Sequence, residues 1–474
     1  MENTHAWFGP LTRIDEYRWE IPQGYRPGMH VPGKVFASEK MMESIKMDQS
    51  LEQVANVAHL PGIVGASMAM PDIHWGYGFP IGGVAAFDMD HGVISPGGVG
   101  YDINCGIRLY RSSMERGDVV ARMEELLGVL MEVVPSGLGS SVKSGLSARE
   151  LRDVITMGAS WVDTAETDVI ESRGCMAGAN PDKLSERALK RGQNQLGTLG
   201  SGNHFLEVGA VEEIFDAEAA KVMGLEIGQV TIMVHTGSRG LGYQTCDDYV
   251  GKLRKVDCGI KLPDRELCCA PLTSNEGHDY MAAMACAANF GFANRHRIGA
   301  NLKVALQKVF NRKEADNVRL IYDVSHNIAK IEIHGTETLC VHRKGATRAF
   351  PPGHREVPRQ YREIGQPVLI PGDMGRYSYV AMGAQGSSET FGSICHGAGR
   401  VLSRGAAKRT LNAEALVKGM KSRGILVRTP SSLKSLVEEA SEAYKDVAEV
   451  VSVVEGAGLA RMVAKLVPLG VVKG

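Results

Sequence analysis

The fold is organised around one stretch of sequence, SPGGVGYDINCGIRL, at residues 95–109. Its three central glycines permit left-handed turns of the backbone and allow another segment or a ligand to approach closely. Asp102 and Cys105 follow in a polar turn between apolar runs, so a carboxylate oxygen and a thiolate sulfur can converge on one divalent cation. The alternative is structural, with Asp102 capping a turn and Cys105 acting as a small buried apolar residue.

Four further turns, each rich in glycine or serine, contain a histidine. They read GNH at residues 202–204, HTGSRG at 235–240, SHN at 325–327 and HGAGR at 396–400. For one histidine alone, a hydrogen-bonded place in the core is the commoner explanation. Several histidines in comparable turns favour a shared role in chemistry, because scaffolds place binding and catalytic residues on loops at strand ends.

The composition is that of a globular protein with a large core. The 474 residues are 44% hydrophobic and 23% charged, and no apolar stretch approaches the roughly 20 residues that span a bilayer. The beginning of the chain shows no signal-peptide pattern, so we expect a cytoplasmic protein without a membrane segment. The nine cysteines include no CxxC pair, which favours reduced thiols over a disulfide framework.

The alternation of short apolar runs with longer helical patterns predicts an α+β fold. We expect a β-sheet core flanked by helices, in a single large mixed domain over residues 1–474, because no internal repeat or charged linker interrupts the chain. Strands are expected at 229–234, 318–324 and 367–370, and helices at 39–57, 275–309, 413–421 and 431–453. The segment 70–88 is expected to be rich in turns.

The net charge of −1 argues against a uniformly basic surface for indiscriminate nucleic-acid binding. A local basic groove is possible at residues 341–363, where six Arg and Lys residues accompany two glutamates. For such a run, a solvated loop is the commoner explanation.

One thiolate, one carboxylate and three imidazoles form a candidate set of metal ligands. These are Cys105, Asp102, His204, His235 and His326. One tetrahedral ion needs only four ligands, so five ligands that include a thiolate able to bridge fit two ions better. The thiolate and imidazoles favour zinc, and the carboxylate leaves manganese open.

His396 is a candidate of another kind, because CHGAGR places glycines and an arginine directly after it. If a helix begins at Gly397, its backbone N–H groups and Arg400 form an anion site beside the imidazole. A neutral imidazole next to a metal-bound phosphate can attack phosphorus and form a covalent intermediate. Arg239, Arg400 and Arg404 are candidates for further phosphate contacts. The alternative is a histidine that merely caps a helical turn.

Eight segments carry a resemblance that extends over nearly the whole chain. They are GGVGYDINCGIRL, LGTLGSGNHFLEV, VHTGSRGLG, SHN, RKGATRAFPPG, PGDMGRYSYV, FGSICHGAGR and a terminal PLGVVKG. In this series and order the chain resembles the RtcB family of RNA-splicing ligases. The resemblance implies an RtcB-like fold and an enzyme that joins RNA 2′,3′-cyclic phosphate or 3′-phosphate ends to 5′-hydroxyl ends. It further implies GTP and two Mn²⁺ ions as cofactors, a role in tRNA splicing or RNA repair, and the helper protein archease as an expected partner.

The same resemblance implies roles for individual residues. Cys105 would bridge two manganese ions held by the five candidate ligands, and His396 would attack the α-phosphorus of GTP. Nucleotide contacts are implied for Asn203, Glu207, Ser378, Gly397, Ala398, Gly399, Arg400, Tyr444 and Lys473, and also for Asp373, where some relatives carry serine. RNA-phosphate contacts are implied for Arg191 and Arg239. Glu207 can accept hydrogen bonds from N1–H and N2–H₂ of guanine while Lys473 donates to O6, a pattern that adenine does not satisfy.

Two other functions would use part of this set. A dimetal phosphoesterase would share the metal ligands but would turn over without GTP, and would not need Glu207, Lys473 or His396. A non-catalytic RNA-binding module would use residues 341–363 together with a structural metal. The Lys-x-Asp-Gly motif of classical nucleotidyl-transfer ligases is absent from the sequence, which leaves a histidine as the nucleophile of a ligase.

Overall fold

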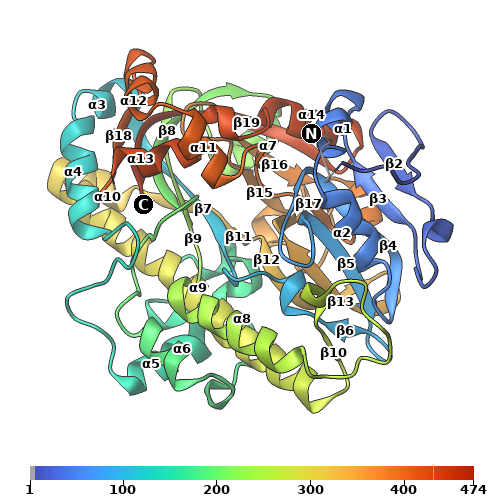
Figure 1. Ribbon diagram of the computed structural model, residues 1–474. Helices are drawn as coiled ribbons and strands as arrows, with labels where there is room; N and C mark the ends of the chain where they lie inside the picture. Colours follow the sequence, from blue (N-terminus) through green and yellow to red (C-terminus); the bar gives the residue numbers. More distant parts are fainter. Residues whose placement is uncertain (1–5, 431) are drawn as a thin grey trace.

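Two β-sheets form the centre of the computed structural model, which describes residues 6–430 and 432–474 (Figure 1). The first sheet has the order β1 (Thr12–Arg13), β2 (Arg18–Ile21), β3 (Gly33–Phe36), β4 (Ile63–His74), β5 (Ile81–Asp88), β13 (Glu337–Lys344) and β12 (Asn327–His334). The second has the order β11 (Arg319–Ser325), β7 (Gly106–Glu115), β9 (Gln229–Thr236), β8 (Phe205–Ile214), β19 (Ala460–Lys473), β16 (Ser378–Gly383) and β15 (Pro367–Ile370). β18 (Leu426–Arg428) pairs with β19, and two small pairs join β6 (Val93–Ile94) to β10 (Ala270–Pro271) and β14 (Ala346–Arg348) to β17 (Ser393–Cys395).

Helices pack around the sheets (Figure 1). They are α1 (Glu39–Ile45), α2 (Ser50–Val57), α3 (Arg116–Val120), α4 (Met123–Val133), α5 (Ala148–Met157), α6 (Glu186–Gly192), α7 (Ala217–Met223), α8 (Arg239–Leu253), α9 (Asn275–Val309), α10 (Arg312–Asp316), α11 (Arg404–Thr410), α12 (Ala413–Ser422), α13 (Leu433–Leu436) and α14 (Val447–Gly456). The predicted α+β fold, with a sheet core flanked by helices, is therefore confirmed.

The long helix α9 follows the predicted bounds and packs against α4, α5 and α8. Ser274 caps its N-terminus by accepting a hydrogen bond from the backbone N–H of Gly277. Most of its middle is buried, because small alanine side chains let the neighbouring elements approach. α9 thus provides a rigid support beneath the second sheet.

The expected helix at 39–57 is wrong as a single element, because the chain turns after α1 and restarts at α2. The Asp48 carboxylate accepts a hydrogen bond from the backbone N–H of Ser50 and so begins the second helix. The expected helix at 431–453 is also divided, into α13, two 3₁₀ turns and α14, while residue 431 lies outside the described residues. Here the backbone leaves the helical path to carry the buried Glu439 and the partly buried Tyr444 into a pocket described below.

The segment 70–88, expected to be turn-rich, is mostly strand. β4 and β5 pair with shifts of register, and residues 75–80 form the connection between them.

The three glycines of the stretch 95–109 differ from one another in conformation and surroundings. Gly100 takes the left-handed conformation with φ of 96°. Gly97 and Gly98 lie in a short 3₁₀ turn. A Cβ would come within 2.5 Å of another segment at Gly97 and within 2.8 Å at Gly98. Their role is close packing.

The basic run at 341–363 is not a solvated loop throughout, because part of it is buried and part of it lines a hollow. Its first part forms β13 and β14, in which Arg343 is buried and donates two hydrogen bonds to Glu332. Arg348 is buried as well and donates to Glu356. Burying these guanidinium groups is tolerated because each has a carboxylate partner. Arg355, Arg359 and Arg362 line a separate hollow.

The strands of the second sheet bring the histidine turns to one end of the sheet. β7 pairs antiparallel with both β9 and β11, and β8 pairs antiparallel with β9. In antiparallel neighbours, the start of one strand lies beside the end of the next. Cys105 precedes β7 and His204 precedes β8, while His235 lies at the end of β9 and His326 directly follows β11. Four residues that are distant in sequence therefore meet.

The nine cysteines are free thiols, and most of them are buried. Within residues 6–430 and 432–474, no helix combines the length and the apolar character that crossing a bilayer requires. α9 is long enough, but it contains several charged side chains.

Candidate metal and nucleotide site

One carboxylate and three imidazoles converge on the sulfur of Cys105. They belong to Asp102, His204, His235 and His326. Its Sγ lies 3.1 Å from Nε2 of His235 and 3.5 Å from Nε2 of His204. Nε2 of His204 lies 2.8 Å from Oδ2 of Asp102, and Nε2 of His235 lies 3.3 Å from Nε2 of His326. These atoms form two overlapping groups with metal-ligand spacing, and both groups include Cys105. The arrangement suits two neighbouring cations that share one sulfur.

The protonation of this cluster fits cations. Nδ1 of His204 lies 2.9 Å from the carbonyl oxygen of Leu199; a carbonyl only accepts, so Nδ1–H donates there and Nε2 is the ring nitrogen that faces Asp102 and Cys105. Burial holds the pKa values of His235 and His326 well below the usual range, so both imidazoles are neutral. Among the described residues, the buried Oδ1 of Asp102 has no hydrogen-bond partner. Lone pairs without donors are what a metal site requires.

The surroundings of Cys105 favour the protonated thiol over the thiolate. Burial, and then the nearby Asp102 carboxylate, raise its pKa well above the usual value. A divalent cation reverses this effect, because it stabilises the thiolate directly. The residues present therefore fit a pair of cations, which the Cys105 thiolate would connect.

Arg295 of α9 fastens the segments that carry the candidate ligands. Its Nη1 donates to the carbonyl oxygens of Asn104 and Thr236, at 2.7 Å and 3.0 Å. Those residues adjoin Cys105 and His235. The same guanidinium pairs at 2.8 Å with Asp323, which lies three positions before His326. Burial alone would raise the pKa of Asp323, but Arg295 and Arg108 hold it below the ordinary value, so the carboxylate stays charged.

His396 lies beside this cluster because β17 pairs with β14. Ala346 of β14 donates to the carbonyl oxygen of His326, and it pairs in register with Cys395. The rings of His326 and His396 are 4.9 Å apart between centroids. The structure thus brings the predicted nucleophile next to the predicted metal ligands.

Asp72, at the end of β4, orients His396. One carboxylate oxygen accepts the backbone N–H of His396 at 2.9 Å and lies 2.5 Å from Nδ1 of its ring. Asp72 is fully buried, so the ring cannot rotate without losing this contact. Nδ1–H then donates to the carboxylate, and Nε2 is left as the nitrogen with a free lone pair.

The condition for a helical anion site is not met, because residues 397–400 form an irregular loop and α11 begins at Arg404. Gly399 has φ of 73°, and a Cβ there would come within 2.2 Å of the carbonyl oxygen of Asp72. Arg400 points toward Glu439 and Tyr444, at 3.3 Å and 2.9 Å. An anion here would therefore meet loop backbone and a guanidinium already paired with a carboxylate.

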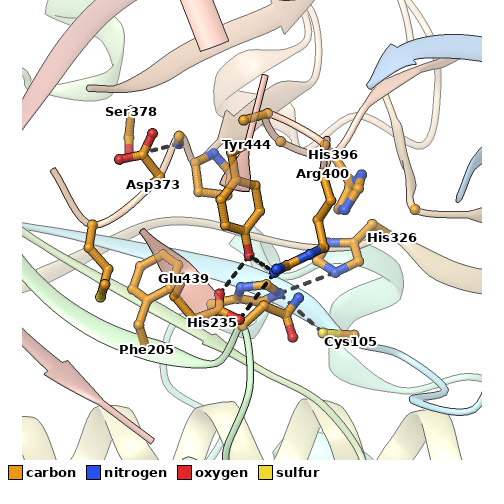
Figure 2. Close-up of a pocket in the computed structure, with 18 of the residues that line it drawn as sticks. Cys105, Phe205, His235, His326, Asp373, Ser378, His396, Arg400, Glu439 and Tyr444 are labelled. Carbon is orange, nitrogen blue, oxygen red and sulfur yellow. Dashed lines mark hydrogen bonds and ion pairs between the residues drawn. The ribbon is translucent and has the colours of Figure 1, made fainter. Parts of the chain in front are cut away.

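One pocket is lined by most of the predicted site residues (Figure 2). The predicted residues that line it are Asp102, Cys105, Asn203, Glu207, His235, His326, Asp373, Ser378, His396, Gly397, Ala398, Gly399, Arg400, Arg404, Tyr444 and Lys473. Figure 2 shows Cys105 and His326 toward one end of the pocket and Asp373 and Ser378 toward the other. The pocket thus joins the residues of the candidate metal cluster to residues predicted to contact the nucleotide.

Three predicted residues lie outside the pocket lining. His204 belongs to the metal cluster through Asp102 and Cys105. Arg239 begins α8, with its Nη1 3.5 Å from Nδ1 of His204. Arg191 is exposed on α6, and its Nη1 donates to Gln244.

A buried carboxylate beside Lys473 was not predicted. Glu439 lies 3.3 Å from Nζ of Lys473 and accepts a hydrogen bond of 2.6 Å from the hydroxyl of Tyr444. Burial lowers the pKa of Lys473, and Glu439 opposes that effect. No local signal marks Glu439, because the surrounding sequence has a helical pattern. Sequence analysis also assigned no role to Asp72.

Comparison with known proteins identifies the family. A family model described as "tRNA-splicing ligase RtcB" matches residues 53–474. The chain belongs to the RtcB family. The tRNA-splicing ligase RtcB of Thermococcus kodakarensis is 53% identical over 479 residues, covering 98% of this chain and 99% of the relative. The tRNA-splicing ligase RtcB of Archaeoglobus fulgidus is 50% identical over 480 residues, with 98% and 99% covered.

An RNA-splicing ligase RtcB from Mycobacterium bovis is 50% identical over 437 residues, covering 89% of this chain and all of the relative. RtcB membership makes the chain an RNA-splicing ligase, so the predicted family and enzyme class are confirmed. The same result argues against the two alternative functions, a dimetal phosphoesterase and a non-catalytic RNA-binding module. The roles of individual RtcB site residues stay predictions, which the geometry supports.

Proposed function

We propose that this ligase joins RNA 3′-phosphate or 2′,3′-cyclic phosphate ends to 5′-hydroxyl ends, using GTP and two Mn²⁺ ions. The observation that carries the proposal is the position of His396. Asp72 holds its Nδ1, and its ring lies 4.9 Å from that of His326 in the candidate metal cluster. A nucleophile with a fixed tautomer beside cation ligands suits transfer of a nucleotidyl group.

The candidate ligands are Asp102, Cys105, His204, His235 and His326. When bound, the cations neutralise phosphate charge and stabilise the negative charge that develops at phosphorus. The carboxylate in the set is compatible with Mn²⁺, while the softer ligands also suit Zn²⁺.

In the first chemical step, Nε2 of His396 attacks the α-phosphorus of GTP. An N–P bond forms, the bond to the bridging oxygen breaks, and pyrophosphate leaves. The imidazole gains positive charge, which the Asp72 carboxylate stabilises through Nδ1–H. His396 then carries a guanylate.

In the next steps the guanylate passes to RNA. Water first opens any cyclic phosphate to a 3′-phosphate. An oxygen of that 3′-phosphate attacks the guanylate phosphorus, and the N–P bond breaks. The 5′-hydroxyl then attacks the 3′-phosphorus and displaces GMP, which leaves a 3′,5′-phosphodiester. Arg191, Arg239, Arg400 and Arg404 are proposed to contact RNA phosphates.

We further propose that residues 1–474 act as one catalytic domain. This is supported by the pocket lining, which combines Cys105 with Lys473 near the C-terminal end of the chain. The family resemblance leads us to propose archease as a partner protein.

The experiment that tests the function is an end-joining assay on RNA with defined termini. With Mn²⁺ present, joined product is expected with GTP and not without it, and ATP should not replace GTP. Joining that proceeds at full rate without any nucleotide would contradict the guanylate mechanism.

Guanine recognition leads to a pH prediction. Burial, and then the neighbouring Asp373 carboxylate, raise the pKa of Glu207 to about 8. Guanine N1–H and N2–H₂ need the ionised carboxylate as acceptor. Because Glu207 is protonated below that pKa, the affinity for GTP is expected to rise from pH 6 to pH 9, by up to about tenfold per pH unit below 8. Calorimetric titration with GTP would measure this.

The Glu207→Gln variant is the matched control for this pH prediction. Its side chain cannot ionise, so its weaker GTP affinity should vary with pH only through the ionisation of GTP itself. The difference between the two profiles isolates Glu207. Profiles that run parallel in the wild type and the variant would show that this carboxylate does not control binding.

A further inference from the structure

A row of three tyrosines adjoins the metal cluster, and none of them has a role in the proposed reaction. The rings of Tyr77 and Tyr101 meet edge to face, with centroids 5.5 Å apart. Tyr101 and Tyr243 are 4.9 Å apart, with ring planes inclined by 33°. The guanidinium carbon of Arg191 lies 5.2 Å from the centre of the Tyr243 ring. The row runs from Tyr77 to Arg191.

The middle ring of the row adjoins the cluster. Tyr101 immediately precedes Asp102, a candidate ligand. Tyr243 lies four residues after Arg239, the first residue of α8. Arg239 in turn reaches to 3.5 Å from His204. The tyrosine row is thus connected to the candidate cluster through Tyr101 and Arg239.

Tyr243 is 48% exposed, whereas Tyr77 and Tyr101 are half-buried. Tyr77 is fixed, because its hydroxyl accepts a hydrogen bond of 2.9 Å from Arg254. Tyr77 supports Tyr101, and Tyr101 supports Tyr243. An exposed aromatic ring held in one orientation by its neighbours loses little entropy when it binds a partner.

We propose that this tyrosine row binds unpaired nucleotides of the RNA substrate next to the end that is joined. A base stacks on Tyr243, and Arg191 and Arg239 contact the flanking phosphates. Stacking on an aromatic ring accepts every base, and arginine guanidinium groups also stack on bases. The site therefore holds single-stranded RNA without reading its sequence. The inference rests on the proposed function for the place of the RNA end.

The first test measures binding of a 3′-phosphorylated single-stranded RNA to the full chain by fluorescence anisotropy. Tyr243→Ala is expected to weaken binding by roughly 5- to 150-fold, whereas Tyr243→Phe keeps the ring and should bind like the wild type. Phe215→Ala is the matched control, since Phe215 is 47% exposed and stacks on Tyr379. It follows the far end of β8, about 30 Å from His204.

The second test locates the stacked base. Abasic sites are placed one at a time near the end of the 3′-phosphate strand, and then near the end of the 5′-hydroxyl strand. An abasic site at the stacked position should weaken binding to the wild type and have no further effect on Tyr243→Ala. The strand that shows this coupling is the one the tyrosines hold. Coupling at no position, or unchanged binding by Tyr243→Ala, would overturn the inference.

Self-guanylylation with GTP needs no RNA, so it separates this inference from the proposed function. If the wild type fails to form a guanylated protein, the proposed function fails, yet a loss of RNA binding in Tyr243→Ala would still support the tyrosine row. If guanylylation and joining proceed but Tyr243→Ala binds RNA normally, the tyrosine row alone is refuted.

Discussion

Substitution of His396 by alanine is expected to abolish formation of a guanylated protein and to lower RNA joining by about 10⁴-fold or more, because removal of a covalent nucleophile leaves no alternative route. No other imidazole in the described pocket is both adjacent to the cluster and anchored by a carboxylate. The measurement is transfer of label from α-³²P-GTP to the protein. Label retained by His396→Ala would refute this assignment.

Asp72→Asn provides the companion variant. An asparagine amide can either donate or accept, so it no longer requires the tautomer with Nδ1 protonated, and it removes the charge that stabilises the imidazolium. Guanylylation is expected to fall by about 10²- to 10⁴-fold while His396 is still present. Metal content should be unchanged in both variants, which distinguishes a lost nucleophile from a lost cluster.

Substitution of Cys105 by alanine is expected to remove metal, guanylylation and joining together. The sulfur belongs to both ligand groups, so one substitution weakens both cation sites. The affinity for Mn²⁺ should fall by at least about 100-fold. Metal content measured by mass spectrometry after dialysis, alongside the label-transfer assay, tests this prediction.

Cys286→Ala is a suitable control for Cys105, because Cys286 is a buried thiol on α9 that belongs to neither ligand group. It should keep its metal and its activity. If Cys105→Ala retained two equivalents of metal and normal joining, the bridging thiolate would have to be abandoned.

Much of the fold was predictable where local pattern and tertiary environment agree. The strand at 367–370 and the helix at 275–309 match their predicted bounds. The strands that carry His235 and lead to His326 were expected within one or two residues. Continuous apolar runs of this length fit buried central strands, so periodicity was informative.

The prediction was wrong where distant pairing decides the conformation. The segment 70–88 contains glycines and two prolines that suggest turns, yet β4 is held as a strand by β3 and β5. Likewise, the backbone is not helical throughout the predicted helix at 431–453, because the side chains of Glu439 and Tyr444 bind Arg400 and each other in the pocket. Neither partner is visible in a local window of sequence.

The residue types were enough to indicate the chemistry of this ligase. A thiol, a carboxylate and several imidazoles in glycine-rich turns carry the coordination and nucleophilic properties in their own functional groups, wherever they lie. The pairing of Asp72 with His396 joins residues 324 positions apart, and Arg295 fastens segments from three strands. Such contacts depend on how the sheets and α9 pack, so orientation, tautomer and the tyrosine row emerged only from the folded chain.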